Sequence, residues 1–172
     1  MINISKGLDL PISGKPDLNI ADTPNVSSVS LLSNDFIGMK PTMLVREGDE
    51  VKVGTKLFED KKNEGIFFTS PAGGEIKSIN RGDKRKFLSV EIEISQNEQY
   101  IEYEFDDSID STKNNLISSG LWNAFRTRPF NRTPAMYDKP SAIFINCCDT
   151  NPLSADPLNI INFDKDYFDD GL

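Results

Sequence analysis

Short segments in which apolar and polar residues alternate fill much of the first hundred positions. Such alternation predicts β-strands, because successive side chains of a strand point to opposite faces of a sheet. The segments are Val26–Leu32, Thr42–Glu47, Gly65–Ser70, Gly74–Asn80 and Phe87–Ser95. Gly-Asp, Val-Gly and Pro-Ala-Gly-Gly sequences separate them, and these residue types favour turns. The pattern predicts a compact, hairpin-rich β module over residues 1–100.

The pattern changes after an acidic bridge. Asp110 or Ser111 is suited to cap a short helix, and Gly120 is suited to the left-handed position that ends it. A proline-punctuated segment rich in arginine and aromatic residues follows. We therefore expect residues 101–140 to contain an acidic bridge, a short helix and an Arg/aromatic connector.

Ser141–Cys148, with the sequence SAIFINCC, is a nearly continuous apolar run. Such a run is typical of a strand buried on both faces of an α/β sheet. We therefore expect residues 141–172 to be the first strand and loop of a truncated α/β domain. The adjacent Cys147 and Cys148 are then expected to be reduced core thiols, because metal sites need separated ligands that converge on one ion.

Charge and composition argue against several classes of function. The 172 residues include 19 Lys and Arg against 27 Asp and Glu, a net charge of −8, which repels nucleic acid and anionic lipid unless basic residues cluster locally. The absence of histidine removes the commonest general base and transition-metal ligand. No apolar run approaches the roughly 18 to 20 residues of a membrane-spanning helix. We expect no catalytic, cofactor-binding or metal residues, no nucleic-acid partner and no membrane span in this chain.

The sequence GDEVKVGTKLFEDKK, Gly48–Lys62, and the later SPAGGEIKSI, Ser70–Ile79, are similar to the two halves of lipoyl and biotinyl carrier domains. This resemblance implies a barrel-sandwich hybrid fold. Carriers display the modified lysine on a tight hairpin tip, whereas EDKKNEG is longer and doubly basic. We expect Lys61 and Lys62 to be unmodified. The alternative is an autonomous group-carrier domain with lipoate or biotin on Lys61 or Lys62, which an intact mass would reveal.

Longer motifs extend the comparison along most of residues 1–160. They are KGLDLPISG at Lys6–Gly14, GMKPTM at Gly38–Met43, Gly48–Ile76, INRGDKR at Ile79–Arg85, SGLWNAFRTRPF at Ser119–Phe130 and DTNPLSADP at Asp149–Pro157. In these motifs the chain resembles the NqrA family, one of the components of the sodium-translocating NADH:quinone reductases (Nqr). Members of that family are longer and continue into a Rossmann-like region. A related component of the Rnf electron-transfer complexes shares the fold but adds Cys-rich iron–sulfur motifs, which this sequence lacks.

The resemblance implies a peripheral, cofactor-free subunit that supports electron transfer from NADH to quinone coupled to Na⁺ export. It implies docking on the other Nqr subunits, especially the membrane protein NqrB, at the cytoplasmic face of the bacterial inner membrane. Flavins and iron centres are expected in the partner subunits, and a contribution of this chain to quinone binding is a further expectation. The implied fold is a barrel-sandwich hybrid, a helical connector and the start of a truncated Rossmann-like α/β domain.

The segment GLWNAFRTRPF, Gly120–Phe130, is the candidate contact site for a partner or quinone. Large apolar side chains lie within a few positions of two arginines, a composition enriched at interface hot spots. The residues are Trp122, Phe125, Arg126, Arg128 and Phe130. In the alternative interpretation, the aromatics pack the domains together and the arginines pair with nearby carboxylates.

Overall fold

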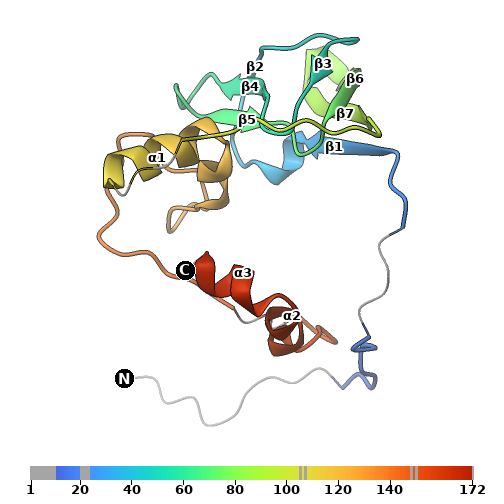
Figure 1. Ribbon diagram of the computed structural model, residues 1–172, viewed down its shortest axis with the longest axis vertical. Coiled ribbons are helices and arrows are strands. Elements are labelled where there is room, and N and C mark those ends of the chain that lie inside the picture. Colours follow the sequence, from blue (N-terminus) through green and yellow to red (C-terminus); the bar gives the residue numbers. More distant parts are fainter. Residues whose placement is uncertain are drawn as a thin grey trace. The chain divides into compact units, whose positions relative to one another are not determined.

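The computed structural model describes residues 11–19, 24–104, 106, 108–147, 149 and 151–171. The chain divides into two compact units, of which Asn25–Lys139 forms one and Met1–Pro24 with Pro140–Leu172 forms the other. The Asn25–Lys139 unit holds the β-strands and the helical connector, whereas two short helices occupy the end of the chain (Figure 1).

Seven strands in the described residues form two antiparallel sheets. They are β1 (Ser28–Leu32), β2 (Pro41–Met43), β3 (Glu50–Val51), β4 (Lys56–Asp60), β5 (Phe67–Thr69), β6 (Gly74–Arg81) and β7 (Phe87–Ile94). One sheet has the order β1-β7-β6-β3 and the other β2-β4-β5. The five strand segments predicted from alternation each overlap a strand, although β2 begins at Pro41 and stops at Met43. The short strand β3 and the strand β4, whose sequence KLFED ends in charged residues, were not predicted.

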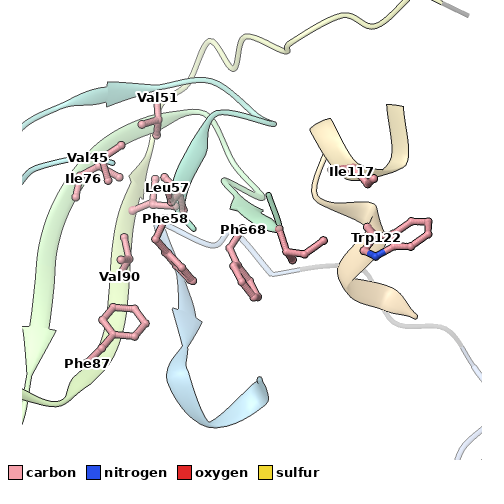
Figure 2. Packing of buried hydrophobic residues seen from close by; sticks show 12 residues of the cluster. Val45, Val51, Leu57, Phe58, Phe68, Ile76, Phe87, Val90, Ile117 and Trp122 are labelled. Carbon is pink, nitrogen blue, oxygen red and sulfur yellow. The ribbon is translucent and has the colours of Figure 1, made fainter. Parts of the chain in front are cut away.

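The core of this unit lies where the two sheets face each other. The Phe58 ring of β4 stacks on Phe68 of β5 at a centroid distance of 4.7 Å and meets the edge of Phe87 at 5.2 Å. Val90 and Ile92 of β7 are fully buried because alternate residues of that strand face inward. Each buried aliphatic side chain of this kind contributes about 1.5–3 kcal/mol. Figure 2 shows Phe58, Phe68, Phe87 and Val90 together with Ile117 and Trp122 of the connector.

The connector begins with α1 (Ile109–Ser118) and the 3₁₀ helix η3 (Leu121–Ala124). The predicted cap at Asp110 or Ser111 is wrong. Ser108 is the N-cap, because its hydroxyl is within reach of the third helical amide and accepts a hydrogen bond from the Ser111 N–H at 3.1 Å. The left-handed conformation expected for Gly120 is confirmed, with φ of 80°.

The predicted buried strand at Ser141–Cys148 is wrong for the residues that the structure describes. Residues 141–147 form no strand, and Ile143, Phe144 and Ile145 are 61%, 87% and 62% exposed. An apolar segment becomes a strand only beside another strand, and the described residues of its unit contain none. Cys147 is an exposed free thiol rather than a core residue. Cys148 lies outside the described residues.

Two helices follow this segment, α2 (Pro157–Phe163) and α3 (Lys165–Asp170). The Asp156 carboxylate caps α2 by accepting a hydrogen bond from the Leu158 N–H at 3.0 Å, and Pro157 occupies the first turn, where no amide donor is needed. Among the described residues, no helix has both the length and the apolar character required to cross a bilayer.

Candidate functional site

Two of the five candidate residues anchor the connector to the β module. Trp122 is only 9% exposed, and its indole N–H donates a hydrogen bond to the Pro134 carbonyl oxygen at 3.0 Å. The ring of Phe125 meets the Trp122 ring edge-on at 5.5 Å. Trp122 belongs to the same hydrophobic cluster as the sheet residues (Figure 2). Phe125 packs against that cluster. Their side chains are thus largely occupied by packing within the unit.

The other three candidates lie on the surface. The exposed Arg126 guanidinium donates hydrogen bonds to the carbonyl oxygens of Asn123 and Phe125, the latter at 3.0 Å. Arg128 is exposed and precedes a cis proline. Phe130 is 72% exposed. Neither arginine forms an ion pair with any residue that the structure describes.

A tight loop presents Phe130. The Thr127 N–H donates to the Arg132 carbonyl oxygen at 2.8 Å, and the Asn131 N–H donates to the Thr127 carbonyl oxygen at 2.9 Å. The Arg132 guanidinium lies over the Phe130 ring at 6.0 Å, at the limit of a cation–π contact. We use the name connector surface for Arg126, Arg128, Phe130 and Arg132. It offers three cations and one exposed aromatic ring.

Polar contacts that were not predicted from the sequence join the connector to β5. The buried Asn123 side-chain amide donates to the Phe67 carbonyl oxygen at 2.6 Å. The Thr69 hydroxyl donates to the Ser119 carbonyl oxygen at 2.7 Å. These partners lie 50 or more positions apart. No local pattern in the sequence indicates such pairs.

The hairpin between β4 and β5 holds Lys61 and Lys62. The Lys62 ammonium donates to the Gly38 carbonyl oxygen at 2.9 Å, and the Lys61 N–H donates to the Lys40 carbonyl oxygen at 2.8 Å. The Asp60 carboxylate accepts hydrogen bonds from the N–H groups of Lys40 and Lys62, both at 3.0 Å. The base of the turn is therefore bound to the segment before β2.

The connector contacts the other side of the same turn. The Asn63 side-chain amide donates to the carbonyl oxygens of Thr133 and Pro134 at 3.3 and 3.2 Å. The Met136 sulfur lies where a side chain on Gly65 would begin, only 2.5 Å from the position of a Cβ there. Both lysines are exposed, but the turn that carries them is fixed on two sides.

Groups for catalysis or metal binding are not gathered at this site. No cluster of three or more metal-ligating side chains occurs among the residues that the structure describes. Tyr103 has a raised pKa because burial disfavours its phenolate, and its hydroxyl donates to the Ser118 carbonyl oxygen at 3.2 Å. Tyr103 thus has a packing role beside α1.

Two facing antiparallel sheets, with a hairpin at the position of the carrier lysine, define a barrel-sandwich hybrid module joined to a helical connector. Residues 2–95 match the family model described as the NqrA N-terminal barrel-sandwich hybrid domain, and residues 108–172 match the one described as the NqrA second alpha/beta domain. The chain belongs to the NqrA family. These matches confirm the predicted fold class, a barrel-sandwich hybrid followed by α/β sequence.

Curated relatives carry the name of the NqrA component of Na(+)-translocating NADH-quinone reductase. The chain is 50% identical to that protein of Glaesserella parasuis serovar 5 (strain SH0165) and 49% identical to that of Yersinia pestis. It is 51% identical to that of Histophilus somni (strain 129Pt). Each alignment of 178 residues covers 100% of this chain and 40% of the relative. The chain therefore spans 40% of the length of these relatives.

Proposed function

We propose that this chain acts as part of a peripheral, cofactor-free subunit of the sodium-pumping NADH:quinone oxidoreductase. In this role it supports electron transfer from NADH to quinone, coupled to Na⁺ export, by docking on the membrane subunits. The observation that carries the proposal is the match to two successive NqrA domains over residues 2–95 and 108–172. The flavins and iron centres belong to the partner subunits in this proposal.

The connector surface is the proposed docking contact. Arg126, Arg128 and Arg132 present cations without carboxylate partners among the described residues, and Phe130 presents an apolar ring beside them. Arginine and aromatic residues are enriched where interfaces bury their central contacts. The membrane protein NqrB, at the cytoplasmic face of the inner membrane, is the partner that we propose for this surface.

The same surface has the chemistry to contact quinone. Guanidinium N–H groups are fixed donors that suit the carbonyl oxygens of a quinone, and an exposed phenyl ring suits its flat, apolar ring. Arg128 and Phe130 lie two positions apart on one tight loop. We therefore propose these two residues, rather than the buried Trp122, as the direct contacts of a quinone.

The hairpin geometry argues against the alternative of a group-carrier domain. A carrier lysine has to extend from the domain body so that a ligase and successive active sites can reach it. Here the Lys62 ammonium is bonded to the Gly38 carbonyl oxygen, and Asn63 and Gly65 contact the connector. Modification of Lys62 would require its ammonium to leave the Gly38 carbonyl oxygen.

Replacement of Arg126 and Arg128 with Ala tests the docking role. In the assembled complex, we expect the full-length double variant to reduce assembly or quinone reductase activity. The melting temperature of the 172-residue chain should remain nearly unchanged. Arg128→Ala alone removes a surface cation without removing a hydrogen bond of the connector, whereas Arg126 also donates to connector carbonyl oxygens. The single variant therefore distinguishes a loss of docking from a loss of packing. Lys52→Ala with Lys139→Ala, two exposed lysines elsewhere in the unit, is the control for charge.

Two results would contradict this role. One is normal assembly and turnover of the double variant in the complex. The other is a loss of several degrees in the melting temperature of the 172-residue Arg128→Ala chain, since that would make the segment structural.

A further inference from the structure

Five cationic side chains line one groove of the β module, although the chain as a whole has a net charge of −8. The groove has a volume of about 310 Å³. Its walls come from the segment around the start of β2 and from the hairpin that joins β6 to β7. We call it the basic groove, and its cations are Lys40, Arg81, Lys84, Arg85 and Lys86.

These charges have no carboxylate partners in the part of the chain that the structure describes. The two ion pairs found there involve Lys77 and Lys165, which do not line the groove. The Arg81 guanidinium donates a hydrogen bond to the Arg85 carbonyl oxygen at 3.5 Å. Cations held together in this way repel one another, and a bound anion would remove that repulsion.

The hairpin that carries four of these cations is tightly fixed. The Gly82 N–H donates to the Lys86 carbonyl oxygen at 2.8 Å, which closes the loop. Phe87 directly after it is 4% exposed and packs against the core. Lys84 and Arg85 both adopt left-handed backbone angles, with φ of 53° and 61°, which residues with side chains seldom adopt. The tight turn thus gathers the charges on a few residues.

The opposite wall is also held in place. The Lys40 N–H donates to the Asp60 carboxylate at 3.0 Å, and its carbonyl oxygen accepts from the Lys61 N–H at 2.8 Å. The apolar side chains of Met39 and Pro41 flank Lys40 in the lining of the groove. A fixed backbone on both walls reduces the ordering that an incoming anion would otherwise require.

We propose that the basic groove binds a phosphate group. Arginine offers a planar fork of N–H donors that matches phosphate oxygens, and lysine adds point charges. The phosphate belongs either to a soluble compound or to the headgroup of an anionic phospholipid. Nucleic acid is disfavoured because the net charge of −8 repels a polyanion and the one aromatic ring lining the groove, Phe87, is buried. The proposal does not depend on the proposed function.

Two binding measurements on the 172-residue chain test it and distinguish the sources. Amide chemical shifts are followed during titration with inorganic phosphate and pyrophosphate. Cosedimentation is measured with vesicles of phosphatidylcholine and phosphatidylglycerol, and with vesicles of phosphatidylcholine alone. We expect shifts at Lys84–Lys86 with the soluble anions, binding to the anionic vesicles, or both. Binding in one arm alone supports the groove and identifies the source.

The test variant is Lys84→Asn with Arg85→Asn, because asparagine tolerates left-handed backbone better than most residues. We expect binding to the anionic vesicles to fall by about fivefold for each charge removed, or about 25-fold for the pair. Binding of the soluble anions should weaken in the same direction. The control variant, Lys52→Gln with Lys139→Gln, removes two charges outside the groove and should bind like the unchanged chain. If the asparagine variant melts early, Lys40→Gln with Lys86→Gln provides a second test that leaves both left-handed residues intact.

Three results would overturn the proposal. The first is an absence of binding in both arms. The second is an equal loss of binding in the groove and control variants, since binding would then be diffuse. The third is binding to a DNA oligonucleotide without binding to phosphate, pyrophosphate or anionic vesicles.

Discussion

Substitution of Gly120 by Ala should undock the connector from the β module. Gly120 has φ of 80°, which an alanine adopts only with strain. Its added methyl would lie 3.0 Å from the Thr69 Cγ2 and closer still to the Thr69 hydroxyl oxygen. That hydroxyl donates to the Ser119 carbonyl oxygen at 2.7 Å, so the methyl would displace the group that joins connector and sheet.

The expected destabilisation has two parts. The left-handed conformation costs about 1–2 kcal/mol for a residue with a Cβ. Loss of the Thr69 hydrogen bond adds about 1 kcal/mol. Gly38 is a matched control, because it also has φ of 80° but an added Cβ there would meet nothing within 4 Å. Gly38→Ala should therefore cost only the first part, so the two variants should differ by about 1 kcal/mol or more.

Equilibrium unfolding in urea provides the measurement. The single tryptophan of the chain is Trp122, so its fluorescence reports on the connector, while far-ultraviolet circular dichroism reports mainly on the rest of the fold. In the unchanged chain the two transitions should coincide, because Trp122 and the sheet residues share one cluster. In Gly120→Ala the fluorescence transition should move to lower urea than the dichroism transition.

Thr69→Ala completes a double-mutant cycle. It removes the hydroxyl and the Cγ2, the two atoms that the new methyl would approach most closely, and leaves the Thr69 Cβ at 3.2 Å. Adding Gly120→Ala to Thr69→Ala should therefore cost less than adding it to the unchanged chain. The reasoning would be refuted if Gly120→Ala were no more destabilising than Gly38→Ala. Full additivity in the cycle would also refute it, because the Thr69 side chain would then not be the obstacle.

Two further predictions concern charged side chains. Intact mass spectrometry of the protein from its native host should find Lys61 and Lys62 unmodified, and stoichiometric lipoate or biotin on either would contradict this. The Lys77–Glu91 pair, 2.6 Å apart, raises the pKa of Lys77 and lowers the pKa of Glu91 through their mutual hydrogen bond. The contribution of this pair to the stability of the folded chain should therefore be complete between about pH 4.3 and pH 10.4. It should be lost in acid as Glu91 is protonated, and in alkali as Lys77 is deprotonated. The melting temperatures of Glu91→Gln and of the unchanged chain should differ at neutral pH. This difference should disappear below the folded-state pKa of Glu91. A difference in melting temperature that persists in stronger acid would be evidence against the pair.

The β module was predictable because local pattern and burial agree there. Alternation along Phe87–Ser95 directs Val90 and Ile92 to one face, and that face is fully buried. The strand predicted at Ser141–Cys148 was wrong because local pattern and burial disagree there. Apolar composition indicates that a segment prefers burial, but it does not supply the neighbouring strand that burial requires. Phe144 is 87% exposed because the described residues of its unit contain no strand with which it could pair.

The candidate site was predictable in composition but not in arrangement. In the sequence, five neighbouring residues share the composition of an interface hot spot and cannot be told apart. They are Trp122, Phe125, Arg126, Arg128 and Phe130. The structure divides them according to contacts with distant segments, such as the bond from the Trp122 indole to the Pro134 carbonyl. Whether an aromatic residue packs or remains exposed depends on which distant backbone faces it, and a single sequence does not encode that locally.

The turn between β4 and β5 is longer than a carrier tip, and its length also explains its contacts with the connector. A tight carrier tip has few groups with which to bind the rest of the domain. The longer turn here adds an amide at Asn63 and, at Gly65, room for the Met136 sulfur. These two residues make the contacts that bind residues 133–136 to the turn. The extra residues that depart from the carrier pattern therefore also hold residues 133–136. Shortening the turn should release that part of the connector, while Asn123 and Ser119 would still be bonded to β5.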